Sequence, residues 1–243
     1  MVVTGPAELL ATWETGLERR AAGRALLLHR AARPEATAEQ LDAEPLGARV
    51  ADLLVLRRAL FGERMQVLLE CAACGEVVEF DLDARGLGEH PRPTGEVLRV
   101  AEGGVAVEFR LPTAADLDAV AAAPVEQRGW RLLEHCTLAA ERDGEPVEPA
   151  RIPEQARRQM AELAEQADPA ADLAVTVHCP HCGGSTPTVL DIADFLWAEL
   201  DSWSRDVLLD VHLLASAYGW SEPWILALSP LRRRYYLELC ADG

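Results

Sequence analysis

The chain has 243 residues, which is enough for one large domain or two small ones with a substantial core. Alanine, leucine, glutamate and arginine dominate, and aromatic residues make up only 5% of the chain, so we expect a mainly helical fold. The formal net charge is -17, and because nucleic-acid binding depends on basic residues that neutralise phosphates, this charge argues against a nucleic-acid partner.

Residues 1–66 are predicted to form an N-terminal helical segment. Two apolar runs near its start indicate two amphipathic helices. Thr37 and Gln40 have the spacing of a capping box, which predicts that a short helix begins at Thr37. A longer helix over 48–61 has an apolar face and a basic flank, and Gly62 is expected to end it. No apolar run reaches the roughly 20 residues of a membrane span, and no signal peptide precedes these helices, so we expect a cytoplasmic protein without membrane contact.

Two C-x₂-C pairs follow, each with a glycine after its second cysteine and β-rich runs on both sides. Two thiolates in one tight turn can bind the same metal ion, and glycine suits the positive φ that closes such a turn. In the cytosol such pairs are metal or redox motifs far more often than disulfides. We therefore expect one structural Zn²⁺ in a split zinc ribbon over 67–83 and 172–190. Its ligands are expected to be Cys71, Cys74, Cys179 and Cys182.

The second pair leaves a redox alternative open. Cys-Pro-His-Cys is the active-site tetrapeptide of oxidising thioredoxin-fold enzymes, so the alternative function is a cytosolic thiol–disulfide oxidoreductase that uses Cys179 and Cys182. Those enzymes place the first cysteine at a helix N-terminus, which lowers its pKa, whereas the glycine-rich stretch after Cys182 disfavours a helix. His178 and His181 border this turn, and either could replace a cysteine ligand or donate to a sulfur.

No other pattern indicates catalysis, so we expect no enzyme activity. Four cysteine ligands leave no open coordination position for a catalytic metal. The signatures of phosphate-binding loops, dinucleotide-binding folds, zinc proteases and serine hydrolases are missing from the sequence. Cys136 and Cys240 stand outside the pairs, and we interpret them as buried or incidental thiols.

Between the two pairs, residues 84–171 are predicted to form an α/β insert. Its expected parts are, in order, a Gly/Pro-rich loop (84–96), a β-hairpin (96–110) with its turn at Gly103-Gly104, a helix capped by Thr113 and Asp116, a helix around Leu132, a loop (144–149) and an amphipathic helix (152–166).

Residues 191–243 are predicted to form a C-terminal helical region. Apolar residues recur at three- and four-residue steps from Ile192 to Tyr218, which predicts a helix of roughly seven turns. Gly219 is expected to end this helix, and two short helices follow, the second of them opened by Pro230.

The last of these helices contains three consecutive arginines, 232–234. We interpret them as its solvated side, with phosphate binding as the alternative, and we expect Leu231, Tyr235 and Leu239 to face inward. Four of the six tryptophans fall in this C-terminal region. They are expected in the core, with a protein-docking patch as the alternative.

Together these patterns predict an α+β, mainly helical fold. N-terminal helices come first, a zinc ribbon assembled from two distant knuckles then encloses the α/β insert, and a long helix with two short ones ends the chain. In four groups of residues the chain resembles a known family. These are Leu60-Phe61-Gly62-Glu63-Arg64, the two cysteine knuckles, Phe109-Arg110-Leu111-Pro112-Thr113, and the tail stretches over 190–200, 218–222, 225–230 and 232–239.

The family that the chain resembles is that of the phage baseplate proteins, also described as baseplate hub assembly chaperones, of contractile phage tails and contractile injection systems. The resemblance implies a non-enzymatic cytoplasmic factor that binds baseplate, hub or other tail proteins and is either retained in the particle or released. An adaptor for an unrelated machine would need the same residues and stays open as a third option.

Overall fold

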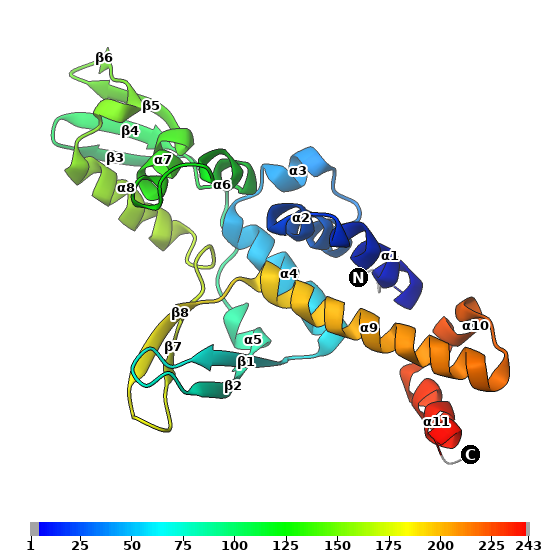
Figure 1. Ribbon diagram of the computed structural model, residues 1–243. Coiled ribbons are helices and arrows are strands. Elements are labelled where there is room, and N and C mark those ends of the chain that lie inside the picture. Colours follow the sequence, from blue (N-terminus) through cyan, green and yellow to red (C-terminus); the bar gives the residue numbers. More distant parts are fainter. Residues whose placement is uncertain (1–4, 242–243) are drawn as a thin grey trace. The chain divides into compact units, whose positions relative to one another are not determined.

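The computed structural model describes residues 5–241 and shows an α+β fold in which about half of these residues are helical (Figure 1). The chain divides into two compact units. The first combines the two ends of the chain, up to Ala31 and from Ala193, and the second comprises Ala32–Ile192. Within 5–241 no helix has both the length and the apolarity that crossing a membrane requires.

The described residues of the first unit form helices and the short segments that join them. Its helices are α1 (Pro6–Leu17), α2 (Ala21–Ala32), α9 (Ile192–Tyr218), α10 (Glu222–Leu226) and α11 (Pro230–Ala241). The expected long helix is therefore confirmed, and Gly219, with a φ of 70°, ends it.

Helix α1 packs closely on α9 because a glycine faces a tryptophan. A Cβ atom at Gly16 would overlap the ring of Trp197, so only glycine allows this approach. The Arg24 guanidinium lies 4.7 Å from the centre of the same ring. The indole Nε1 of Trp13 donates to Asp201 Oδ1 at 2.8 Å, which satisfies the polar atom of a buried side chain.

Helix α11 is turned differently from the prediction. Leu231, Tyr235 and Leu239 are 65%, 60% and 62% exposed, so the expectation that they face inward is wrong. Arg233 faces inward instead and is only 7% exposed. Its Nε lies 3.0 Å from Asp210 Oδ2 of α9, and this ion pair compensates the burial of the guanidinium.

The aromatic residues of the C-terminal region pack on one another. The Tyr218 and Trp220 rings are stacked with their centres 4.5 Å apart, and Trp224 and Tyr236 lie 4.4 Å and 4.9 Å from Trp220. Trp224 remains 48% exposed. The cluster therefore joins α9, α10 and α11 and also reaches the surface.

The second unit contains the remaining elements. They are α3 (Ala38–Asp42), α4 (Leu46–Phe61), β1 (Arg64–Glu70), β2 (Val77–Asp83), α5 (Ala84–Leu87), β3 (Leu98–Glu102), β4 (Val105–Phe109), α6 (Ala114–Val120), α7 (Val125–Cys136), β5 (Thr137–Arg142), β6 (Glu145–Pro146), the 3₁₀ helix η1 (Pro149–Arg151), α8 (Glu154–Ala167), β7 (Ala174–His178) and β8 (Ser185–Val189).

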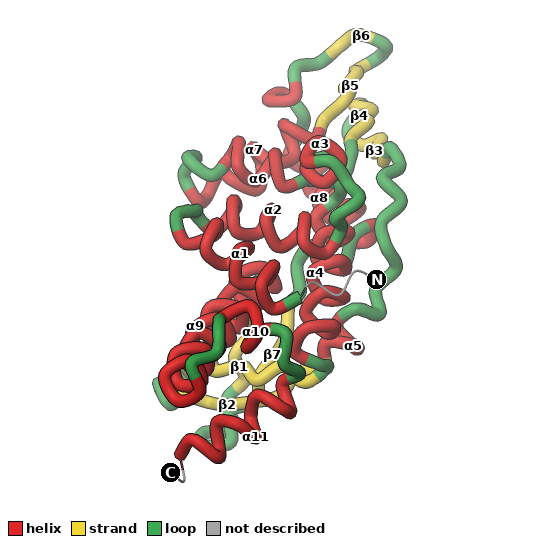
Figure 2. The backbone as a smooth tube through the Cα atoms, turned by 90° about the vertical axis from the view of Figure 1, so that its right-hand side faces the viewer, coloured by secondary structure: helices red, strands yellow, loops and turns green. Residues whose placement is uncertain are grey.

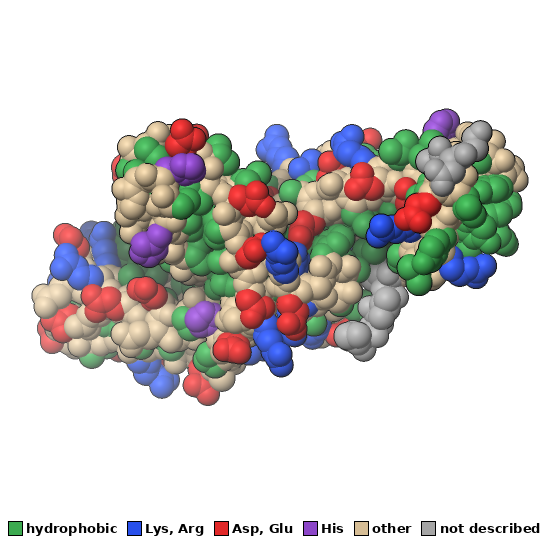
Figure 3. All heavy atoms as spheres, turned by 90° about the horizontal axis from the view of Figure 1, so that it is seen from below, with side chains coloured by type: hydrophobic (Ala, Val, Ile, Leu, Met, Phe, Trp, Pro, Cys, Tyr) green, Lys and Arg blue, Asp and Glu red, His purple; other side chains and the backbone are tan. Residues whose placement is uncertain are grey.

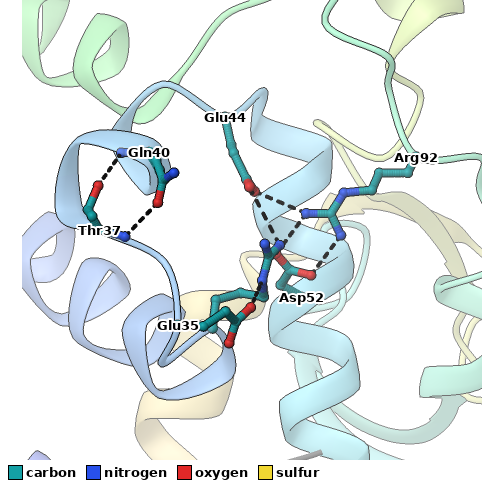
Figure 4. A network of polar contacts seen from close by, with 7 residues as sticks. Glu35, Thr37, Gln40, Glu44, Asp52 and Arg92 are labelled. Atoms are coloured by element: carbon teal, nitrogen blue, oxygen red, sulfur yellow. Dashed lines mark hydrogen bonds and ion pairs between the residues drawn. The ribbon is translucent and has the colours of Figure 1, made fainter.

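The predicted helix signals before the first knuckle are confirmed. Thr37 Oγ1 accepts from the Gln40 N–H, and Gln40 Oε1 accepts from the Thr37 N–H at 2.8 Å (Figure 4). Helix α4 begins at Leu46, two residues before the predicted start. Gly62 has a φ of 85° and ends it as expected.

A network of ion pairs joins α4 to segments on both sides of it (Figure 4). Arg92, in the loop after α5, donates to both carboxylate oxygens of Asp52 at 2.8 Å and 2.9 Å and to Glu44 at 3.0 Å. Arg33 reaches the same two carboxylates. The long loop after α5 is thus tied to α4 although it has no regular structure.

A four-stranded antiparallel sheet, in the order β3-β4-β5-β6, packs against α8. The predicted hairpin is confirmed, with Gly103 and Gly104 both at positive φ. The prediction of a loop over 144–149 is wrong at Glu145–Pro146, which forms a short strand paired with β5. The prediction of a loop over 84–96 is wrong at Ala84–Leu87, which forms the helix α5. The core between the sheet and α8 consists of Val100, Val105, Val107, Phe109, Ala140, Ile152, Ala156 and Met160.

The other strands form two separate hairpins, β1–β2 and β7–β8. The two hairpins lie side by side in both backbone views (Figures 1 and 2). Buried residues of both hairpins form one cluster of Cys71, Val78, Val177 and Cys179, with Leu69 and Phe80 packed against it. The hairpin tips, which carry the cysteine pairs, therefore meet in space.

Candidate metal centre

Each cysteine pair lies in a tight turn that joins two antiparallel strands. In the first turn the Cys71 N–H donates to the Glu76 carbonyl at 2.9 Å, and the Gly75 N–H donates to the Cys71 carbonyl at 2.8 Å. The equivalent bonds from Cys179 and Gly183 in the second turn measure 2.8 Å and 2.9 Å. Gly75 and Gly183 have φ values of 75° and 72°. The two knuckles thus share one backbone conformation, and each needs its glycine.

The four sulfurs converge although the pairs are more than 100 positions apart. Cys71 Sγ lies 3.7 Å from Cys182 Sγ, and Cys74 Sγ lies 3.8 Å from Cys179 Sγ. All four sulfurs are within 4.8 Å of one another. With Zn–S bonds of about 2.3 Å, the sulfurs of a tetrahedral site lie about 3.8 Å apart. The donor set and its spacing therefore fit a tetrahedral metal ion, and all four cysteines are free thiols.

The sulfurs also influence one another electrostatically. The backbone N–H groups of Ala73 and Cys74 lower the pKa of Cys71 to about 6. The Glu76 N–H lowers the pKa of Cys74, but burial and the neighbouring sulfurs outweigh it and raise this pKa to about 12. One thiolate therefore forms readily and opposes the next one, and a divalent cation would remove that repulsion.

Several other candidate residues lie outside the cluster. Within the described residues 5–241, the metal-binding cluster consists of the four cysteines and includes neither His178 nor His181. Cys136 is fully buried in α7, and burial raises the pKa of its thiol to about 12. Cys240 lies in α11, in the other unit.

The surroundings of Cys179 do not resemble a thioredoxin-type active site. Cys179 follows strand β7, and the chain after Cys182 enters strand β8 at Ser185. The helix N-terminus that lowers the pKa of the reactive cysteine in such enzymes is therefore not formed by this segment.

Two residues next to the sulfurs were not identified from the sequence. Thr186 Oγ1 accepts from the Ala72 N–H at 3.2 Å and lies 4.0 Å from Cys71 Sγ. A Cβ atom at Gly184 would lie 3.2 Å from Ala73 Cβ and 3.3 Å from Cys182 Sγ, so the second knuckle leaves room here for the first. The Thr186 contact crosses between distant segments, and no local pattern signals it.

A family model described as T4 bacteriophage base plate protein matches residues 49–197. The matched range begins in α4, includes both knuckles and the sheet between them, and ends in α9. Neither a curated protein nor a solved structure matches the chain.

Proposed function

Because this chain belongs to the T4 bacteriophage base plate protein family, we propose that it is a non-enzymatic assembly factor or structural component of the baseplate or hub of a contractile tail or contractile injection system. The match over residues 49–197 is the observation that carries this proposal. The family supports a role exerted through contacts with other tail or baseplate proteins. A chaperone that is released after assembly and a component that stays in the particle are both forms of this role.

The proposal includes one structural zinc ion, held by Cys71, Cys74, Cys179 and Cys182. The sulfur spacing supports this assignment, as does the shared conformation of the two knuckles. When bound, the ion supplies a cross-link between hairpins that are distant in sequence, and structural zinc sites contribute on the order of 10 kcal/mol to folding.

We also propose a division of the chain around this ribbon. Residues 67–83 and 172–190 form the split zinc ribbon, and residues 84–171 form its insert. Residues 1–66 and 191–243 are the flanking helical parts, which act in the cytoplasm or in the assembled particle.

The exposed stripe of α11 is our candidate surface for the tail partner. We define it as Leu231, Tyr235 and Leu239, which are spaced by four residues and therefore lie on one side of the helix. Arg232 and the Arg234–Glu238 ion pair flank the stripe. Figure 3 shows apolar side chains gathered over part of the C-terminal helices. Exposed apolar residues rimmed by charges are typical of protein-binding surfaces.

Affinity purification from native extracts tests the proposal. We expect the tagged protein to retain another tail or baseplate protein, identified by mass spectrometry. The triple variant Leu231→Ser/Tyr235→Ser/Leu239→Ser should lose that partner and keep its unfolding temperature, since the three side chains are exposed.

The matched control is Val125→Ser/Leu138→Ser, which changes two equally exposed apolar residues of the other unit. It should retain the partner. Purification of the wild-type protein without any tail component would contradict the proposed function. Full retention by the triple variant would contradict only the assignment of the α11 stripe.

A further inference from the structure

The two knuckles share their backbone hydrogen bonds, and two of the matched positions at which their sequences differ lie at the contact between them. The residue after the first cysteine is Ala72 in one knuckle and Pro180 in the other. The fourth residue after the second cysteine is Val78 in the first knuckle and Thr186 in the second. Both of these strand residues are buried, at 6% and 9% exposure.

The contacts across the centre explain why the two differences occur together. Ala72 has a backbone N–H, and the Thr186 hydroxyl accepts from it at 3.2 Å. Pro180 has no N–H to satisfy, and at the position equivalent to Thr186 the chain has the apolar Val78. Thr186 thus supplies a hydroxyl to the Ala72 N–H, whereas Val78, at the equivalent position of the first knuckle, has no hydroxyl. The Ala72–Thr186 bond is partly buried. The pairs Ala72–Thr186 and Pro180–Val78 are each self-consistent, because the first has a donor and an acceptor and the second has neither.

The same hydroxyl also contacts the metal-binding group. A threonine hydroxyl can accept one hydrogen bond and donate another, and Thr186 Oγ1 lies 4.0 Å from Cys71 Sγ, to which it donates a long hydrogen bond. Thr186 therefore holds Cys71 through its sulfur and through the N–H of the next residue. Groups that orient metal ligands in this way typically change metal affinity 10- to 100-fold when they are removed.

We propose that Thr186 is a positioning residue for the metal centre, which fixes the Cys71 sulfur from the opposite knuckle and so slows metal release. This inference rests on the proposed zinc site. The proposed role depends on the hydrogen bonds of the Thr186 hydroxyl and not on the packing of its side chain.

The test uses the full-length zinc-loaded protein and two readouts. The first is the rate of zinc transfer to a chromogenic chelator. The second is the sulfur-to-metal charge-transfer band of the Co²⁺-substituted protein, which responds to hydrogen bonds at the ligating sulfur. Thr186→Val keeps the β-branched shape and removes the hydroxyl, so we expect zinc release about tenfold faster and a shifted band. Thr186→Ser should behave like the wild-type protein, and so should Thr176→Val, a control at an exposed position of β7.

A double variant separates the two contacts of the hydroxyl. Ala72→Pro/Thr186→Val copies the Pro180–Val78 arrangement into the other knuckle, and Pro180 occupies the equivalent position of a turn with the same backbone hydrogen bonds. Because no N–H is then left without a partner, we expect this variant to recover most of the slow zinc release. The shift of the charge-transfer band should persist, since the bond to the sulfur is still missing.

The outcomes distinguish this inference from the proposed zinc site. A wild-type protein that takes up no zinc would overturn both. Zinc release and a Co²⁺ spectrum unchanged in Thr186→Val would overturn the role of Thr186 and leave the zinc site standing. If Thr186→Val does not fold, Thr186→Ser decides: wild-type release supports the role of the hydroxyl, and accelerated release overturns it.

Discussion

At the scale of single residues, a carboxylate binds the first turn of helix α4 at a glycine. Gly47 is the second residue of α4, and its N–H donates to Asp168 Oδ2 at 2.9 Å. The carboxylate thus binds at the N-terminus of a 16-residue helix, where the helix dipole favours negative charge. A Cβ atom at position 47 would overlap Asp168 Oδ1, so this arrangement requires glycine.

We therefore predict that Gly47→Ala destabilises the protein by about 2 kcal/mol, because the carboxylate must leave the helix N-terminus or strain the backbone. Equilibrium urea unfolding measures this loss. The matched control is Gly129→Ala in the exposed part of α7, where an added Cβ meets no atom within 4 Å. Its effect should have the opposite sign and be about 0.5 to 1 kcal/mol, since alanine is the better helix former. Equal effects at the two positions would contradict the role of Asp168.

The sequence identifies single functional residues only where their spacing along the chain is characteristic. The four cysteines were predicted to converge because each C-x₂-C turn places two thiolates where they can bind the same metal ion, and the sulfurs do converge. Buried charges could not be found in this way. Arg57 belongs to the basic flank of α4 in the sequence, yet it is buried and donates to the carbonyls of Gly62 and Arg64. These two carbonyls lie beyond the end of the helix, where helical periodicity gives no information.

At the scale of elements, α6 is held by a cap that the sequence predicted and an arginine that it did not. Asp116 Oδ2 accepts from the Thr113 N–H at 2.9 Å and from the Thr113 hydroxyl at 2.8 Å, which completes the capping box. Arg110 adds two bonds to the same carboxylate, at 2.6 Å and 2.8 Å. Burial raises the pKa of Asp116, but these donors outweigh it and lower the pKa to about 2.

This shift predicts a pH dependence of stability. The pKa of Asp116 is lower in the folded protein than in the unfolded chain, so its contribution is complete above about pH 4 and is lost as the pH falls towards 2. The size of the shift corresponds to about 2 kcal/mol. Urea unfolding of the wild-type protein and of Asp116→Asn between pH 6 and about pH 2 should give stabilities that differ most near neutral pH and converge in acid. A difference that stays constant over this range would contradict the assignment.

The sheet shows which strands a sequence can reveal. Strands β3 and β4 alternate apolar and polar residues around Gly103-Gly104, and both glycines adopt the positive φ that this tight turn needs. Strand β5 has two alanines at its centre and an exposed leucine, Leu138, so neither β propensity nor alternation marks it. It is a strand because β4 offers it a partner along most of its length. That pairing is a tertiary effect outside any local window.

At the scale of the whole molecule, the cysteine cluster belongs entirely to one of the two units. The first unit has a helical core with Leu10, Trp13 and Leu196 among its buried residues. The second unit contains all four clustered cysteines, and two of them belong to the small buried cluster that its two hairpins share. An isolated two-stranded hairpin is at best marginally stable in water, so we expect a cross-link between the tips to stabilise both hairpins.

Removal of the proposed zinc should therefore act on one part of the chain. We predict that a strong chelator increases amide hydrogen exchange in β1, β2, β7 and β8 at least tenfold, because the hairpins lose their cross-link. Helices α1 and α10 of the first unit should keep their protection, since no sulfur of the cluster belongs to that unit. Exchange followed by mass spectrometry measures both, with zinc-saturated chelator as the control. Equal loss of protection in both units would show that the centre stabilises the molecule globally, and unchanged exchange in the hairpins would show that the four sulfurs hold no metal ion that matters for the fold.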